Sequence, residues 1–199
     1  MAMATLDVNL VKSLREQTGA GVGECQQALR EADGRLDEAL KILKARGAAI
    51  AAKKATRVAK QGVISAYVHG GRIGVLIEVS SETDFVARNE KFREFVRALE
   101  LQIASMNPAY LAPEEVPPEV VGAELEQLHE QLEGAEGEGF VSAQKSHMEK
   151  FYARLCLLNQ PYVKDESKTI RDLLTETIAA TGENIVIRRF TRYQLGDSA

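Results

Sequence analysis

Three carboxylates, Glu78, Glu82 and Asp84, lie close together in the sequence near the end of a β-type segment. Neighbouring carboxylates can divide the acid and base roles of an enzyme between them. The sequence, however, arranges no basic residue beside them to orient a substrate. Acid–base catalysis is therefore not the expected use of this segment, and we do not expect the chain to be an enzyme.

The histidines and cysteines offer no familiar nucleophilic or metal-binding pattern. His69, His129 and His147 lie in no HExxH motif, and no serine occupies a nucleophile elbow. Cys25 and Cys156 are far apart, so they indicate neither a disulfide framework nor a zinc site. We expect Cys156 to be a small core residue in a protein of the reducing cytoplasm. No metal and no cofactor are expected.

Glycines crowd the segment from Gly19 to Gly23, which superficially suggests a phosphate-binding loop. The dinucleotide fingerprint G-x-G-x-x-G needs a last glycine where this chain has Glu24. A P-loop needs a closing Gly-Lys-Ser/Thr, which is absent. We therefore expect these glycines to form a tight turn between two helices.

The charge of the chain bears on its partners. A net charge of −4 argues against a protein that coats nucleic acid. The segment from Lys44 to Lys60 nevertheless holds six basic residues and no acidic one. It could be a solvated connector between domains, or a patch for nucleic acid or an acidic protein. No stretch of about 18 apolar residues predicts a membrane span.

Three short amphipathic helices are predicted at the amino terminus. Asp7 is a plausible N-cap, Asp33-Gly34 ends the second helix, and Gly47 is the expected C-cap of the third. The residues expected inside are Val8, Val11 and Leu14 in the first helix, Cys25, Ala28 and Leu29 in the second, and Leu36, Ala39, Leu40 and Leu43 in the third. We expect an independent three-helix module over residues 1–50, followed by a basic linker over 51–61.

The pattern changes to an α+β core over residues 62–199. Strands are expected at 63–69 and 73–79, joined by a tight turn at Gly70-Gly71. A strong helix opens at Asn89 and ends before Pro108, with Phe92, Phe95, Val96, Leu99 and Ile103 on its inner face.

The rest of the core is less uniform. Residues 112–146 are rich in glutamate and proline, which predicts an acidic, protruding and partly mobile excursion. Two helices follow, one ending before Pro161 and one, with Ile170 and Ile178 inward, ending at Gly182. A last strand over 184–195 is expected at a sheet edge. A small antiparallel sheet packed with helices is thus the predicted core.

The connection over residues 80–89 joins the second strand to the long helix. Thr83 can cap a short helical turn, and Asn89 can cap the helix that follows. Asp84 and Phe85 then lie side by side on a segment held at both ends, which is a good place to present function. Alternatively, Phe85 folds back into the core and Asp84 acts as a second cap.

This connection carries a resemblance to a known family. Residues 83–89, Thr-Asp-Phe-Val-Ala-Arg-Asn, resemble the TDFVARN signature of the elongation factor Ts family. Residues 14–21 (LREQTGAG), 53–55 (KKA), 160–165 (QPYVKD) and 182–190 (GENIVIRRF) resemble its other conserved blocks, in the family's order. The stretch from Ala112 to about Ser146 matches weakly.

The resemblance implies a guanine-nucleotide exchange factor for elongation factor Tu, acting by protein–protein binding without covalent chemistry. The amino-terminal module, similar to a ubiquitin-associated domain, would dock on the partner, with Thr18, Gly19, Ala20 and Gly21 among its contacts. Asp84 and Phe85 would intrude near the partner's nucleotide site and dislodge its magnesium. Thr83 and Val86 would set the turn, and Arg88 and Asn89 would support it.

Other interpretations remain open at this point. The three-helix module could make the chain a protein-binding adaptor without exchange activity. A nucleic-acid-binding factor using Lys44 to Lys60, or an unrecognised hydrolase, are further alternatives. The chain also resembles the family's short form, which implies that two chains pair, so a homodimer is a hypothesis. We expect no direct contact with nucleic acid or membrane.

Overall fold

The computed structural model describes residues 7–132 and 138–197 of the 199-residue chain. The chain forms two compact units. The first comprises residues 1–64, 78–97 and 172–188, and the second comprises 65–77, 98–171 and 189–199. The α+β class predicted from the sequence is confirmed, and each unit is described by itself below.

The amino-terminal module of the first unit contains α1 (Val8–Thr18), α2 (Val22–Glu31) and α3 (Leu36–Lys54). Asp7 caps α1 as predicted, because its Oδ1 accepts a 2.8 Å hydrogen bond from the N–H of Asn9. The three helices share one apolar core, made of Val11, Leu14, Cys25, Ala28, Leu29, Ala32, Ala39 and Leu43. Leu36 and Leu40 are half-buried and pack against this core, so the predicted inner faces are confirmed except at Val8, which is 78% exposed.

The end of the third helix was predicted wrongly at Gly47. The helix α3 continues to Lys54, so it runs through the boundary expected near residue 50. The alanines that surround Gly47 are the strongest helix formers, and one glycine costs only about 1 kcal/mol relative to alanine. A β-carbon at Gly47 would lie 3.7 Å from Thr175 Cγ2 and 3.8 Å from Ala179 Cβ, so this glycine packs against α8.

A three-stranded sheet has the order β1-β2-β5, with β1 (Gln61–His69), β2 (Ile73–Ser81) and β5 (Val186–Gln194). Gly70 and Gly71 form the predicted hairpin turn, and their φ angles of 55° and 68° are ones that glycine adopts freely. The last strand lies at a sheet edge, as predicted. Both β2 and β5 pass from one unit to the other along the chain.

Three helices lie next to the strands of this sheet in chain order. They are α4 (Asp84–Arg88) and α5 (Glu90–Met106) after β2, and α8 (Ile170–Thr181) before β5. The predicted inner face of α5 is buried at every position: Phe92, Phe95, Val96, Leu99 and Ile103. Gly182 ends α8 as predicted, with a φ of 71° and its N–H bonded to the carbonyl of Ile178 at 2.9 Å.

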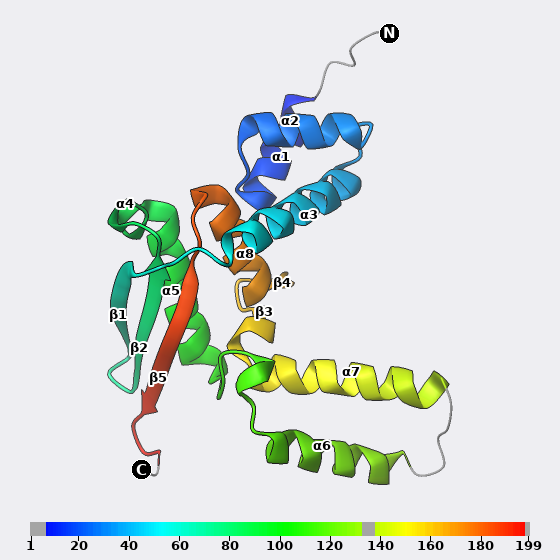
Figure 1. Ribbon diagram of the computed structural model, residues 1–199, viewed down its shortest axis with the longest axis vertical. Helices are drawn as coiled ribbons and strands as arrows, with labels where there is room; N and C mark the ends of the chain where they lie inside the picture. Colours follow the sequence, from blue (N-terminus) through cyan, green and yellow to red (C-terminus); the bar gives the residue numbers. More distant parts are fainter. Residues whose placement is uncertain (1–6, 133–137, 198–199) are drawn as a thin grey trace. The chain divides into compact units, whose positions relative to one another are not determined.

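The acidic stretch of the second unit is largely helical. It contains η1 (Pro113–Glu115), α6 (Pro118–Gln131) and the start of α7 (Glu138–Leu155), and α6 and α7 lie side by side in Figure 1. Val116, Phe151 of α7 and Cys156 form a buried cluster, against which Val120 and Val121 of α6 pack. The mobility predicted for this excursion stays a prediction, and residues 133–137 of it lie outside the described residues.

Two short elements of the second unit were not predicted. After η2 (Leu157–Asn159), strands β3 (Pro161–Tyr162) and β4 (Asp165–Thr169) form an antiparallel pair. Their residues are mostly polar and too few to show an alternating pattern, so nothing in the sequence marks them as strands. Buried Gln102 holds this region, because its amide donates to the carbonyl of Pro161 and accepts from the N–H of Val163.

Candidate functional site

The connection between β2 and α5 contains the one-turn helix α4, and both of its predicted caps are present. The hydroxyl of Thr83 accepts a 3.4 Å hydrogen bond from the N–H of Val86. Asn89 Oδ1 accepts a 2.9 Å hydrogen bond from the N–H of Lys91 at the start of α5. The turn that carries Asp84 is therefore held at both ends by side-chain caps, which satisfy N–H groups that helix geometry leaves free.

Phe85 lies at the surface of this turn. Its side chain is 81% exposed, and the alternative in which it folds back into the core is wrong. Ala87 of the same helical turn is buried instead. Ala87 is thus the one buried residue of α4, and Phe85 is the one that faces solvent most fully.

Asp84 is the first residue of α4, and Thr83 rather than Asp84 caps the helix. The Asp84 Oδ2 atom pairs with Arg88 Nη2 at 2.9 Å, across one helical turn. Both side chains are at least half exposed, so this pair contributes only a few tenths of a kcal/mol to stability. Arg88 thus holds the carboxylate of Asp84 without burying it.

A second carboxylate reaches the turn from a distant part of the sequence. Glu183 Oε2 accepts from the N–H of Thr83 at 3.0 Å, and Oε1 accepts from the Thr83 hydroxyl at 2.6 Å. The hydroxyl of Ser81 donates to the carbonyl of Thr83 at 2.8 Å. The N–H, carbonyl and side chain of Thr83 are therefore all bound, which fixes where the turn begins.

The residues next to Thr83 and Glu183 bond in the opposite sense, with the carboxylate on the earlier segment and the N–H on the later one. Glu82 Oε1 accepts a 2.7 Å hydrogen bond from the N–H of Asn184, and Glu82 Oε2 lies 3.5 Å from Arg57 Nη1. The buried Asn184 donates from its side chain to the carbonyls of Ala55 and Arg57, at 3.4 and 2.7 Å. Sequence patterns singled out no role for Glu183 or Asn184, although both follow the helix-ending Gly182 in one of the blocks that resemble the family.

The turn between α1 and α2 carries the second set of predicted contacts. Gly19 has a φ of 67° and its N–H bonds to the carbonyl of Arg15 at 2.8 Å, which ends α1. The hydroxyl of Thr18 donates to the carbonyl of Leu14 at 2.7 Å and accepts from the N–H of Ala20. Residues 19–21 thus form an interhelical turn, as predicted, whereas Gly23, which was also expected in the turn, lies in α2.

The structure brings these two sets of residues into contact through Lys91. Its Nζ donates a 2.9 Å hydrogen bond to the carbonyl oxygen of Gly19. Gly19 and Lys91 belong to the same compact unit. Because Lys91 is the second residue of α5, it links the end of α1 to the segment directly after the Asp84–Phe85 turn.

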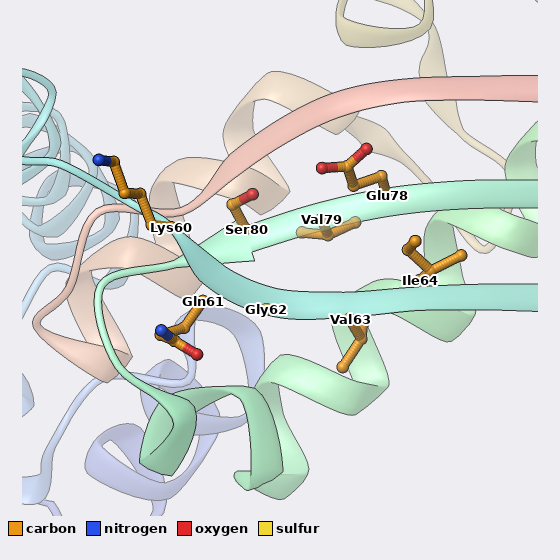
Figure 2. Close-up of a pocket in the computed structure, with 8 residues that line it drawn as sticks. All are labelled: Lys60, Gln61, Gly62, Val63, Ile64, Glu78, Val79 and Ser80. Atoms are coloured by element: carbon orange, nitrogen blue, oxygen red, sulfur yellow. The ribbon is translucent and has the colours of Figure 1, made fainter.

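The three carboxylates that first suggested acid–base chemistry have separate surroundings. Asp84 pairs with Arg88 and Glu82 binds Asn184, as described above. Glu78 lines a shallow hollow of about 210 Å³ between β1 and β2, shown in Figure 2. The hollow is lined by Lys60, Gln61, Gly62, Val63, Ile64, Glu78, Val79 and Ser80. The carboxylates do not form a common site.

Gly62 has a structural role at this hollow. Its φ of 138° is one that other residues rarely adopt, and a β-carbon there would lie 2.1 Å from the carbonyl oxygen of Val79. The start of β1 therefore crosses β2 more closely than any side chain would permit. Figure 2 shows Val63 and Ile64 pointing to opposite sides of β1, as expected for adjacent residues of a strand.

The histidines are dispersed as well. His69 Nδ1 lies 2.8 Å from the hydroxyl of Tyr67, and His147 Nε2 lies 2.6 Å from Glu124 Oε1. His129 packs edge-on against Phe140, with ring centroids 5.2 Å apart. Across residues 7–132 and 138–197, no group of three or more histidines, cysteines or acidic residues is placed to hold a metal ion.

Both cysteines are buried and unsuited to nucleophilic chemistry. Burial raises the pKa of the Cys25 thiol above its usual value, and burial raises the pKa of Cys156 to about 11. The thiolate is the reactive form, so a raised pKa makes each thiol inert near neutral pH. The prediction that Cys156 is a small core residue is confirmed.

Within the part of the chain that the structure describes, no helix combines the length and apolarity that a membrane span requires.

A comparison with protein families matches residues 4–197 to the family Elongation factor TS. Three proteins named Elongation factor Ts illustrate the similarity. The one from Alkaliphilus oremlandii is 48% identical over 194 residues, covering 96% of this chain and 90% of its own. The one from Acetivibrio thermocellus is 50% identical over 191 residues, covering 94% and 89%. The one from Caldanaerobacter subterraneus subsp. tengcongensis is 50% identical over 195 residues, covering 96% and 98%.

Proposed function

The chain belongs to the elongation factor Ts family, and we propose that it promotes guanine-nucleotide exchange on elongation factor Tu by inserting Asp84 and Phe85 near the partner's nucleotide site. Membership in the family makes the chain a translation elongation factor. The proposal concerns which residues act and how. It also places the protein in the cytoplasm, with elongation factor Tu as its partner and no direct contact with nucleic acid.

The observation that carries this proposal is the exposure of Phe85. An aromatic side chain that is 81% exposed, on a turn capped by Thr83 and Asn89, has its apolar surface available to a partner. Burying a phenylalanine side chain gains roughly 1.5–3 kcal/mol. That gain can offset distortion of the partner's nucleotide site. The turn loses little conformational entropy on binding, since the caps at Thr83 and Asn89 already fix its backbone.

The proposed mechanism acts on the partner's magnesium. Magnesium bridges the phosphates of a bound nucleotide and neutralises their charge, so a displaced ion weakens nucleotide binding. Phe85 and Asp84 would displace it by entering beside the site. By linkage, the factor weakens nucleotide binding by the same ratio as nucleotide weakens binding of the factor. The chain would thus accelerate both release and loading, without covalent chemistry and without a cofactor of its own.

The module over residues 1–50 would provide the second contact, through Thr18, Gly19, Ala20 and Gly21. The Lys91–Gly19 hydrogen bond supports this assignment, because it ties that turn to the start of α5. Val86 is half-buried and Thr83 fully bonded, which suits residues that set the turn, while Arg88 pairs with Asp84 and Asn89 caps α5 directly after the turn. The connector predicted over 51–61 would then join this module to the core over 62–199.

Two chains are proposed to pair as a homodimer. The support is the position of β5 at the edge of the three-stranded sheet, since an edge strand can pair with another chain. A monomeric mass at micromolar concentration, measured by light scattering, would count against this pairing.

The second candidate is a protein-binding adaptor. The separate apolar core of α1, α2 and α3 favours it, because that module can present a surface without the rest of the chain. In this case the full chain binds its partner through the module, and replacing Phe85 does not change the affinity for that partner.

Release of fluorescently labelled GDP from elongation factor Tu tests the proposal, with the factor at catalytic amounts. The wild-type protein is expected to accelerate release strongly, and Phe85→Ala to lose most of that acceleration. Val141→Ala is the control. It shortens an exposed apolar side chain on a different helix, α7, and should behave as wild type. Acceleration that survives in Phe85→Ala would keep the exchange activity and remove this mechanism.

A further inference from the structure

Glu183 lies between α8 and β5 and reaches Thr83, which is 100 residues earlier in the sequence. Its two carboxylate oxygens accept from the N–H and the hydroxyl of Thr83, at 3.0 and 2.6 Å. A charged acceptor shortens and strengthens such bonds. Two bonds to one residue fix its orientation as well as its position, so Glu183 sets the direction in which the chain leaves Thr83.

The bond to the hydroxyl also determines how Thr83 caps α4. A hydroxyl has one proton and two lone pairs. Because the proton goes to Glu183, a lone pair of Thr83 Oγ1 remains for the N–H of Val86, 3.4 Å away. A helix of five residues is too short to be stable by itself in water. The shape of α4 therefore depends on a carboxylate from another segment of the chain.

The neighbouring pair makes this attachment reciprocal. Glu82 accepts from the N–H of Asn184 at 2.7 Å, while Glu183 accepts from the N–H of Thr83. The two segments thus hold each other through two acidic residues. Asn184 extends the network to the carbonyl of Arg57 at 2.7 Å. All of these residues lie in one compact unit, so the attachment is a property of that unit.

We infer that Glu183 is a positioning residue for nucleotide exchange, which acts by holding Thr83 so that Asp84 and Phe85 stand ready at the surface. The inference rests on the proposed function, in which Asp84 and Phe85 enter the partner. Glu183 itself need not touch the partner. Without its carboxylate the turn would sample other conformations, and the factor would have to order it on binding.

The test is Glu183→Gln, assayed as release of labelled GDP over a range of elongation factor Tu concentrations. Glutamine has nearly the same size but no charge, and an NH2 group replaces one of the two oxygens, so it cannot reproduce the arrangement in which each oxygen accepts from one donor of Thr83. We expect kcat/KM to fall about tenfold, which corresponds to about 1.4 kcal/mol. Glu124→Gln is the matched control: Glu124 also uses both carboxylate oxygens, Oε1 toward His147 and Oε2 toward Arg154, and its replacement should leave exchange unchanged.

A second pair of variants separates positioning from a general loss of structure. Thr83→Val removes the hydroxyl at constant size and is expected to lower exchange as Glu183→Gln does. Thr83→Ser keeps the hydroxyl and is expected to retain at least half of wild-type activity. Circular dichroism at the assay temperature verifies that each variant is folded. Loss of activity in Thr83→Ser equal to that in Thr83→Val would overturn the role of the hydroxyl bond.

A double-mutant cycle with Phe85→Ala decides whether Glu183 acts through Phe85. At high factor concentration, where the residual rate of Phe85→Ala is measurable, Glu183→Gln is expected to cause a smaller fractional loss than in the wild-type background, because only Asp84 remains to be positioned. An equal fractional loss in both backgrounds would overturn the inference. If Glu183→Gln matches wild type while Phe85→Ala is impaired, only this inference fails. An inactive wild-type factor would remove the proposed function and, with it, the inference.

Discussion

The ammonium group of Lys91 donates a 2.9 Å hydrogen bond to the carbonyl oxygen of Gly19, 72 residues earlier in the chain. Gly19 ends α1 in a left-handed conformation, with a φ of 67°. Lys91 follows the Asp84–Phe85 turn by only a few residues. One side chain thereby relates the two segments through which we propose that the factor contacts its partner.

Replacing this lysine should weaken exchange without unfolding the protein. Lys91→Met keeps the aliphatic part of the side chain and removes the donor. We expect exchange to fall by about threefold, because an exposed hydrogen bond contributes about 0.5–1.5 kcal/mol. Release of labelled GDP measures the effect, and Lys41→Met, which removes an exposed partner of Glu38, is the control. Exchange equal in both variants would show that the Lys91 bond does not matter for activity.

The close crossing at Gly62 predicts a large loss of stability for Gly62→Ala. The added methyl group would meet the carbonyl oxygen of Val79 at 2.1 Å, and backbone atoms cannot swing aside. With the φ of 138° as a further cost, we expect a loss on the order of 3 kcal/mol in the free energy of unfolding. Urea denaturation measures it. Gly74→Ala in β2 is the control, because a β-carbon there meets nothing within 4 Å.

The core of the amino-terminal module predicts contrasting effects for two residues of α1. Leu14 is fully buried, so Leu14→Ala should cost about 2–5 kcal/mol through lost burial and the cavity that remains. Val8 is 78% exposed, so Val8→Ala should change stability by less than about 0.5 kcal/mol. Thermal unfolding of the full chain compares the two. A similar cost at both positions would contradict the burial described for α1.

The raised pKa of Cys156 predicts a loss of stability at alkaline pH. Burial holds its folded pKa at about 11, above the ordinary value of 9.0. The unfolded thiol therefore loses its proton first, and this contribution to stability is complete below pH 9 and declines as the pH rises toward 11. Urea denaturation at several pH values measures the decline. It should be smaller in Cys156→Ala, and an unchanged pH dependence in that variant would assign the decline to other groups.

The same burial predicts slow chemical modification. A thiol reagent at pH 8 should react with native protein much more slowly than with urea-unfolded protein, since both Cys25 and Cys156 are buried and their pKa values are raised. Absorbance of the released reagent product follows the reaction. Rapid labelling of one thiol in the folded protein would contradict the burial of that cysteine.

The local structure of the site followed directly from the sequence. The caps at Asp7, Thr83 and Asn89 depend on side chains that bond N–H groups two or three residues away. The inner face of α5 follows from a helical repeat, and the β1–β2 turn from two adjacent glycines. Each of these features is determined within a few residues, so its signal is contained in a short stretch of sequence.

The direction of Phe85 was decided by the tertiary structure. The sequence allowed this side chain either to enter the core or to face outward, because both positions satisfy the caps around it. Burial depends on which surface lies opposite, and here Ala87 occupies the inward position. The continuation of α3 through Gly47 has the same origin, since neighbouring alanines and contact with α8 outweigh one glycine.

Long-range partners were also beyond the reach of sequence patterns. Glu183 and Thr83 are 100 residues apart, and Lys91 and Gly19 are 72 apart. Nothing in the residues near either end of such a bond specifies the other end, because chain folding rather than spacing brings them together. The sequence by itself thus determined the inner face of α5, the caps and the family. Only the tertiary structure decided which side chain the turn exposes and which carboxylate holds it, because both depend on atoms that are distant along the chain.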